Sequence, residues 1–320
     1  AGISDARGAT TVNKLCGSGM KATMFAHDLI RAGSGEILLA GGMESMSNAP
    51  HLLTRARGGY RLGHGELKDH MFLDGLEDAE SGQLMGAFAQ QVADNRGYSR
   101  ERMDDFAIAS LERAMAAHEA GELGGEIAPV TVASRHGESI VEHDEQPFAA
   151  RLDKIRTLRP AFSREGTITA ANSSSISDGA SALILASRGA AEAVGASVQA
   201  TLLGHATHSQ HPSEFTLAPV GAIGKLLERL GWSADDVDLY EINEAFAVVT
   251  LIAIDELGLD HDKVNVFGGA CAQGHPIGST GSRIIVTLLN ALRRRGGKRG
   301  IASLCIGGGE ATAIAVELAD

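Results

Sequence analysis

Residues 10–22, TTVNKLCGSGMKA, have the pattern of a strand that turns at glycine into a helix. Residues 10–15 predict the strand, and the apolar residues that follow predict a buried helix over 19–31. A second apolar strand is predicted over 36–40, where two glycines end it. Cys16 lies in the turn, where the positive end of the helix dipole is expected to lower the pKa of its thiol. The stretch therefore predicts a strand–turn–helix–strand unit that carries a nucleophile.

A second cysteine, Cys305, has a matching setting near the C-terminus, in RGIASLCIGGGEATA, residues 299–313. It closes an apolar strand and is followed by glycines, as Cys16 is. The elements predicted around it are a strand over 263–267, a helix over 282–295, a strand over 301–305 and a last strand over 312–318. One β–turn–α–β unit used twice predicts a layered α/β fold with an internal duplication.

The region between the two units, residues 47–176, has little strand periodicity and is interpreted as an insertion with a binding function. It contains a predicted amphipathic helix over 99–118. Its residues 151–164, RLDKIRTLRPAFSR, hold five basic side chains against one acid, Asp153. Charge alone leaves two interpretations open, a solvated surface or a cradle for an anionic group such as a nucleotide phosphate. After the insertion, a strand is predicted over 177–187 and a helix over 218–230.

Composition limits the kinds of protein that this chain can be. Its 320 residues can bury a large core. Its three cysteines lack regular spacing, which argues against a disulfide framework and predicts a reducing compartment, the cytoplasm. A formal charge of −12 argues against duplex nucleic acid as a partner. The sequence contains neither an apolar run long enough for a membrane span nor the pattern of a secretory leader, so no membrane association is predicted.

Four segments place a polar or reactive side chain after a predicted strand, beside a glycine or a helix start. In open α/β sheets such positions converge outside the carboxyl ends of the strands. Cys16 is the candidate nucleophile, and His275, held between a glycine and a proline, is the candidate base. Asn243 offers an amide that can hold a water or a substrate oxygen. Cys305 can take or give a proton, and the glycines after both cysteines expose N–H groups for an oxyanion.

Other reactive residue types receive structural interpretations. His205, His208 and His211 are close in the sequence, but no carboxylate or cysteine has ligand spacing beside them, so no metal is predicted. Cys271 is interpreted as a small apolar residue that fills space near the site. His27 is interpreted as a hydrogen-bonded histidine of the core.

The motifs in these segments, taken together, resemble the thiolase family. They are VNKLCGSG (12–19), NEAFA (243–247), GHPIG (274–278) and CIGGG (305–309), and the similarity covers the whole chain. The resemblance implies a five-layer α/β/α/β/α sandwich of two similar halves, with an inserted loop domain that binds CoA. The expected parts are an incomplete N-terminal half over 1–46 and 177–197, the loop domain over 47–176, and the C-terminal half over 198–320.

The resemblance also implies a role for each site residue. Cys16 matches the nucleophile that becomes acylated, His275 its base, and Cys305 the residue that moves a proton at the acetyl Cα. Asn243, through a water, would share an oxyanion hole with His275, and the N–H groups of Cys16 and Gly307 would form another. The residues that match contacts to the CoA pantetheine or lie on the substrate side are Phe162, Phe246, Ser174 and Met85.

The implied activity is an acetyl-CoA C-acetyltransferase that condenses two acetyl-CoA or catalyses the reverse thiolysis. It uses CoA thioesters without a further cofactor and acts as a homodimer or homotetramer. Three alternatives remain: a 3-ketoacyl-CoA thiolase for longer chains, a carrier-protein-dependent condensing enzyme, against which Cys305 argues, and a truncated, inactive scaffold. The last is considered because members of the family usually have a longer segment before the nucleophile. Leu84 stands where biosynthetic members often have histidine.

Overall fold

A four-stranded sheet forms the centre of the computed structural model, which describes residues 2–135 and 137–319. Its strands, in spatial order, are β7 (Ala200–Ser209), β10 (Glu310–Leu318), β9 (Arg299–Ile306) and β8 (Leu239–Ile242). Strand β10 pairs antiparallel with both β7 and β9, whereas β8 pairs parallel with β9. Helix α9 (Ile277–Arg295) packs on one face and helix α6 (Ala218–Leu230) on the other. Strands β9 and β10 are therefore almost wholly buried.

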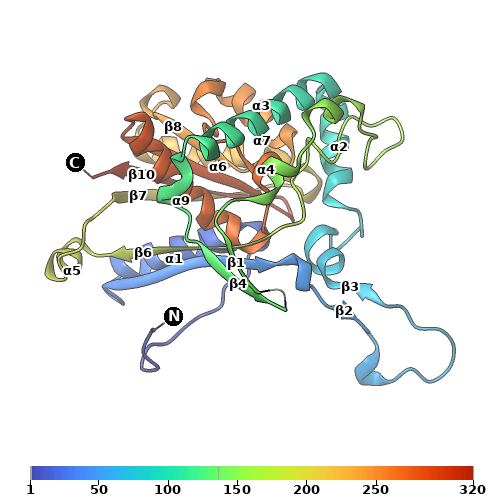
Figure 1. Cartoon of the computed structure of the whole chain (residues 1–320), viewed down its shortest axis with the longest axis horizontal. Helices are drawn as coiled ribbons and strands as arrows, with labels where there is room; N and C mark the ends of the chain where they lie inside the picture. The colour runs from blue at the N-terminus through green and yellow to red at the C-terminus, as the bar shows by residue number, and fades with distance from the viewer. Residues whose placement is uncertain (1, 136, 320) are drawn as a thin grey trace.

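A second, smaller sheet lies below the first in Figure 1 and pairs β1 (Ile37–Ser45) with β6 (Asp178–Ala186) antiparallel. Helices α1 (Ser18–Arg31) and α9 pack against it. Its other face carries exposed apolar side chains, including Leu39, Met43 and Ile184. The described residues thus build four layers in the order β1/β6, α1 with α9, the four-stranded sheet, and α6. The α/β sandwich is as predicted, but these residues supply no outer helix layer over β1/β6.

Glycines allow the two sheets and their shared helices to approach closely. A Cβ atom on Gly42 of β1 would collide with the carbonyl oxygen of Gly278 in α9. A Cβ on Gly281 of α9 would collide with the backbone nitrogen of Met20 in α1. These contacts join backbone to backbone, so little can move to make room for a larger side chain. The N-terminal elements are therefore fixed directly to α9.

The elements near the C-terminus agree with the sequence. The predicted strands over 301–305 and 312–318 are β9 and β10, and the helix predicted over 218–230 is α6. The strand predicted over 177–187 is β6. The helix predicted over 282–295 is α9, which begins earlier, at Ile277. Each of these segments has the apolar period of its element, and each is covered by a neighbouring layer.

Two predicted strands are wrong. Residues 10–14 have no regular structure, and Leu15–Gly17 is a 3₁₀ turn. No strand pairs with residues 10–14 in the described part of the chain, and a β-prone run without a partner cannot form a ladder. The strand predicted over 263–267 is a 3₁₀ turn, His261–Lys263, followed by a single bridge from Val264 to Tyr240.

Two further predictions were partly wrong. Strand β1 does not end at the two glycines but continues through them to Ser45, because its partner β6 pairs with it over that whole length. Helix α1 is not buried on most of its surface. Met20 and Met24 are buried, whereas Phe25 and Leu29 are exposed. The many apolar residues of α1 therefore did not indicate which faces of the helix are covered by other elements.

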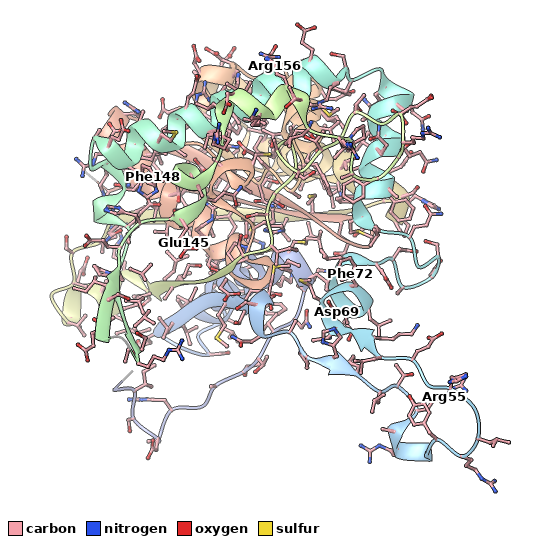
Figure 2. The ribbon with its side chains drawn as sticks, turned by 45° about the vertical axis from the view of Figure 1, so that its right-hand side comes forward. Arg55, Asp69, Phe72, Glu145, Phe148 and Arg156 are labelled. Carbon is pink, nitrogen blue, oxygen red and sulfur yellow. The ribbon has the colours of Figure 1, made fainter. Side chains whose placement is uncertain are left out.

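The insertion contains helices α2, α3 and α4 and two small hairpins. Its helix predicted over 99–118 is α3 (Arg100–Glu119), and the Ser99 hydroxyl caps it by accepting from the Arg102 N–H. The other elements are α2 (Met85–Arg96), α4 (Glu145–Ala149), hairpin β2 (His51–Leu52) with β3 (Lys68–Asp69), and hairpin β4 (Val130–Ser134) with β5 (Gly137–Val141). Figure 2 shows Arg55 on the long loop between β2 and β3, which extends away from the body.

Three short helices complete the structure: α5 (Arg188–Ala193), α7 (Ala247–Leu257) and α8 (Ala270–Gln273). Helix α7 packs with α2 and α3 in one buried cluster that also includes Cys305. This cluster connects the insertion to the end of β9. Among the helices of the described residues, none is both long and apolar enough to cross a membrane.

Candidate active site

Cys16 lies in the 3₁₀ turn directly before α1 and keeps partial solvent contact. The preceding Leu15 has φ of 50°, a left-handed conformation that is rare for a leucine and that turns the chain sharply here. Gly17 follows because a Cβ there would collide with the side chain of Ile306 at the end of β9. The turn is therefore pressed against the strand that carries Cys305.

Burial raises the pKa of the Cys16 thiol to about 11. The N–H groups of Gly307 and of Cys16 itself favour the charged sulfur and oppose this rise, while the carboxylate of Glu44 adds to it. The expectation that the start of α1 lowers this pKa is wrong in direction, because desolvation of the thiolate outweighs the nearby N–H groups. At neutral pH the residue is a thiol, and it needs a base to become a nucleophile.

His275 is oriented by a hydrogen bond that leaves one of its ring nitrogens without a partner. Its Nδ1 lies 2.6 Å from the Thr280 hydroxyl, which donates its own proton to the Pro276 carbonyl. The hydroxyl therefore accepts from Nδ1–H, and this tautomer leaves a lone pair on Nε2. The Nε2 atom is buried without a hydrogen-bond partner. Burial and the charge of Arg283 lower the pKa of His275 to about 3, so the imidazole is neutral.

Asn243 contributes two more polar atoms without partners. It directly follows β8, and its N–H donates to the Ser303 carbonyl of β9 at 3.0 Å. Its side chain is 2% exposed, yet neither Oδ1 nor Nδ2 has a hydrogen-bond partner. A buried amide without partners is costly unless a water or a ligand completes it. Asn243 and the Nε2 atom of His275 are therefore prepared to bind an oxygen from outside the chain.

Cys305 lies at the end of β9 and is 1% exposed. Burial raises the pKa of its thiol, and the charge of a Cys16 thiolate would raise it further. The two sulfurs thus influence one another. The following Gly307 lies beside Met85 and Leu15, since a Cβ on it would be 3.3 Å from the Met85 sulfur and 3.6 Å from a Leu15 methyl. The two cysteine segments meet at this glycine.

Aromatic and hydroxyl side chains from the insertion and from the segment after β8 adjoin these residues. The rings of Phe162 and Phe246 are edge to face, with centroids 6.0 Å apart. Phe162 also packs on Gly86, where a Cβ would collide with its ring. The Ser174 hydroxyl donates to the Ala245 carbonyl, next to Phe246, at 3.1 Å. Phe162, Phe246, Ser174 and Met85 are thus connected through neighbouring residues.

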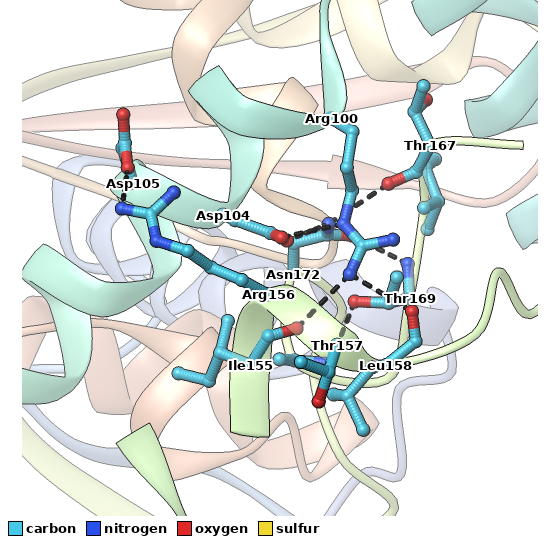
Figure 3. Close-up of polar contacts among 12 residues, drawn as sticks. Arg100, Asp104, Asp105, Ile155, Arg156, Thr157, Leu158, Thr167, Thr169 and Asn172 are labelled. Atoms are coloured by element: carbon cyan, nitrogen blue, oxygen red, sulfur yellow. Dashed lines mark hydrogen bonds and ion pairs between the residues drawn. The ribbon is translucent and has the colours of Figure 1, made fainter. Parts of the chain in front are cut away.

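The basic stretch of residues 151–164 is only partly free to bind an anion. Arg151 pairs with Asp153 at 3.0 Å, and Arg156 pairs with Asp105 of α3. Figure 3 shows Arg100 reaching from α3 to hold the stretch by its backbone, through the carbonyls of Ile155 and Leu158. Two exposed cations of the stretch have no ion-pair partner within the described residues. They are Arg159 and Arg164, which flank Phe162.

The motifs around this site have relatives among known proteins. Residues 1–189 match the thiolase N-terminal domain and residues 196–318 the thiolase C-terminal domain. The chain belongs to the thiolase family. An acetyl-CoA acetyltransferase of Chromobacterium violaceum is 45% identical over 99% of this chain and 81% of its own length.

Solved thiolases have the same fold. Human mitochondrial 3-ketoacyl-CoA thiolase has a TM-score of 0.92 and 38% identity, and the match covers 96% of this chain and 78% of that one. The Acat5 thiolase of Ascaris suum, solved in complex with coenzyme A, has a TM-score of 0.90 and 39% identity over the same shares. Both identities are high enough for the likeness to extend beyond the fold to the family.

Some residues that organise this thiolase site were missed in the sequence. Thr280 sets the tautomer of His275, and the only signal for it is a hydroxyl one turn into the helix after the GHPIG motif. Glu44 accepts from the Gly278 N–H at 3.0 Å and places a carboxylate near Cys16. The left-handed conformation of Leu15 has no sequence signal, because leucine rarely adopts it.

Proposed function

We propose that this thiolase is an acetyl-CoA C-acetyltransferase, which condenses two acetyl-CoA into acetoacetyl-CoA and CoA and catalyses the reverse thiolysis. The observation that carries the proposal is the set of unpartnered polar atoms on Asn243 and His275. The backbone of Asn243 bonds to the strand of Cys305, and His275 lies just before the helix that packs on the Cys16 turn. Unpartnered polar atoms of this kind suit an oxygen that develops negative charge, and the neutral imidazole suits the activation of a thiol. The name of the Chromobacterium relative agrees with this chemistry.

In the first half-reaction Cys16 attacks the thioester carbonyl of acetyl-CoA while its proton moves to Nε2 of His275. The N–H groups of Cys16 and Gly307, which already face the sulfur, stabilise the tetrahedral oxyanion. The carbon–sulfur bond to CoA then breaks. The departing CoA thiolate takes the proton of Cys305, which leaves an acetylated Cys16, a charged His275 and a Cys305 thiolate.

In the second half-reaction the Cys305 thiolate removes a Cα proton from another acetyl-CoA. The enolate oxygen is held by the charged imidazole of His275 and by a water on Asn243. The enolate carbon attacks the acetyl group on Cys16 and forms acetoacetyl-CoA. The Cys16 thiolate that is released recovers its proton from His275, so all three groups return to their starting states.

The CoA moiety is proposed to bind between the insertion and the site. Phe162 and Phe246 offer a surface for the pantetheine, Ser174 offers a hydroxyl, and Met85 borders the acyl group beside Gly307. The two unpaired cations of the basic stretch, Arg159 and Arg164, are suited to the phosphates of CoA. We propose further that the enzyme acts in the cytoplasm as a homodimer or homotetramer and needs no cofactor besides its CoA substrates.

Acyl-enzyme formation tests this proposal directly. Wild-type protein mixed with acetyl-CoA is expected to gain one acetyl group by intact-mass spectrometry, and peptide mapping should place it on Cys16. The Cys16→Ser variant is expected to gain none. The Cys305→Ala variant is the matched control. Its departing CoA thiolate can take the proton from His275 instead, so this variant should still be acetylated but should not form acetoacetyl-CoA. Stable acetylation at another residue contradicts the assignment of Cys16, and absence of acetylation in the wild type supports an inactive scaffold.

A 3-ketoacyl-CoA thiolase for longer chains is the second candidate, supported by the fold match to the human mitochondrial enzyme of that name. Leu84, next to Met85, is apolar at the position where the family resemblance implies a histidine in biosynthetic members. Thiolysis rates for acetoacetyl-CoA and for a long-chain 3-ketoacyl-CoA separate the two. A higher kcat/KM for the long substrate favours the second candidate.

A further inference from the structure

His27, Asp28 and His205 form a compact cluster of metal-ligating side chains apart from the cysteines. His27 and Asp28 are neighbours on α1, and His205 lies on β7, the edge strand of the four-stranded sheet. Their ligand atoms all lie within 4.8 Å of one another. Asp28 is separated from His205 by 177 positions in the sequence, so only folding brings the three together.

The distances inside the cluster agree with the edges of a coordination polyhedron. Asp28 Oδ1 lies 2.9 Å from His205 Nε2 and 3.2 Å from His27 Nδ1. Ligand atoms at about 2.0–2.2 Å from a zinc ion are about 2.9–3.5 Å apart when they subtend octahedral or tetrahedral angles. The two observed separations lie within this range. One carboxylate oxygen thus lies within hydrogen-bonding distance of two imidazole nitrogens, and the same three atoms are close enough for one ion to replace these contacts.

The two histidines of the cluster are largely buried, whereas the aspartate is open to solvent, and this combination suits a bound ion. The two imidazole side chains are largely buried, at 14% and 15% exposed, and their rings meet edge to face with centroids 5.2 Å apart. Asp28 is 55% exposed, which leaves an entry path and room for water ligands. The nearest cation on the helix is Arg31, one turn further on, and it pairs with none of the three.

We propose that His27, Asp28 and His205 bind a divalent transition-metal ion, Zn²⁺ being the best match, through two imidazole nitrogens and one carboxylate oxygen. Three protein ligands and a solvent-accessible fourth position are a common arrangement for zinc, and imidazole with carboxylate is a donor set that this ion accepts readily. The ion would connect α1 of the N-terminal elements to the edge of the four-stranded sheet. This proposal departs from the expectation that the chain holds no metal.

The site is separate from the reaction centre. His27 lies eleven positions after Cys16 on the helix that begins beside that cysteine, which places it about 16 Å further along the axis. None of its three ligands belongs to the acetyl-transfer machinery. Loss of the ion is therefore expected to change stability and the attachment of α1, not the chemical step.

Titration of the purified full chain with Co²⁺ and Zn²⁺ tests the proposal. We expect one Co²⁺ per chain, seen as visible d–d absorption without a thiolate charge-transfer band, and displacement by Zn²⁺. Isothermal titration should give at least tenfold weaker Zn²⁺ binding for His205→Gln. His70→Gln is the matched control, because His70 and Asp74 form a similar exposed pair, 2.6 Å apart, and belong to no larger ligand group among the described residues.

The second variant, Asp28→Asn, is included in case His205→Gln does not fold. The Asp28 side chain is half exposed, and asparagine has nearly the same shape. Circular dichroism checks that both variants are folded. Equal affinity in wild type and Asp28→Asn overturns the proposal. A thiolate charge-transfer band also overturns it, because that band places the ion on the catalytic cysteines. Absence of saturable binding in the wild type overturns it as well. Binding that only His70→Gln weakens would place the metal at the other pair.

Discussion

The two cysteines of the site lie beside sheets that differ in the number of their strands and in the helices that cover them. Cys305 ends β9, which has a strand on each side and a helix layer on each face. Cys16 precedes α1, whose sheet has only two strands and an outer face with Met43 80% exposed. The burial of β6 alternates residue by residue, whereas that of β10 is nearly continuous. A strand covered on both faces can be apolar throughout, and one covered on a single face alternates.

This difference shows that a side chain can be desolvated even where the sheet next to it is covered on one face only. Burial raises the thiol pKa of both cysteines, although only Cys305 lies inside a fully covered sheet. Cys16 receives its environment from the other half, through Ile306 and Gly307 at the end of β9. The environment of Cys16 therefore depends on how closely the turn before α1 packs against the end of β9.

The largest expected effect is a difference between the two sheets in how much a large-to-small substitution lowers the free energy of unfolding. Ile314 of β10 is fully buried between α9 and its neighbours, so Ile314→Ala should lower the free energy of unfolding by about 2–5 kcal/mol. Leu39 on the outer face of β1 is exposed, and Leu39→Ala should change it by less than about 0.5 kcal/mol. Urea denaturation measures both. Similar losses for the two variants would show that the outer face of β1 is covered in solution.

The next prediction concerns the reactivity of the two thiols with pH. With a pKa of about 11, the thiolate fraction of Cys16 should rise about tenfold per pH unit from 7 to 10. Its alkylation by iodoacetamide should rise in parallel, because the thiolate is the reacting form. Cys305 should react far more slowly at every pH, since it is buried. Mass spectrometry of digested peptides measures both rates, with Cys16→Ala as control. A plateau for Cys16 below pH 9 would contradict the raised pKa.

The accuracy of the sequence-based predictions depends on whether a local pattern or a distant partner decides the element. Strands β9 and β10 and helix α6 were predicted well, because local apolar period decides elements that are covered on all sides. The strand predicted over residues 10–15 failed, because a strand depends on a partner far away in the sequence. The exposure of Phe25 and Leu29 could not be seen either, since the layers above α1 are set by tertiary packing.

The candidate site was predicted better than the forces acting on it. Cys16, His275, Asn243 and Cys305 follow from reactive side chains beside glycines or helix starts. In the structure Asn243 follows β8, Cys305 lies near the end of β9, Cys16 precedes α1 and His275 precedes α9. Their roles stay predictions. The sign of the Cys16 pKa shift was wrong, because a helix start is visible in a sequence and desolvation is not. The cluster of His27, Asp28 and His205 was missed, because His205 lies 177 positions from Asp28 in the sequence and only folding brings them together.

The smallest effect tests the backbone contact that joins the two parts. Gly42→Ala places a methyl group against the Gly278 carbonyl of α9, so it should lower the free energy of unfolding by about 1–3 kcal/mol. It should also slow acetylation of Cys16, because the contact holds the N-terminal elements against α9. Gly189→Ala is the control: its position on α5 faces open space, and alanine there should add about 0.4–1 kcal/mol. If both variants match the wild type in urea denaturation and acetylation rate, the contact does not hold the parts together.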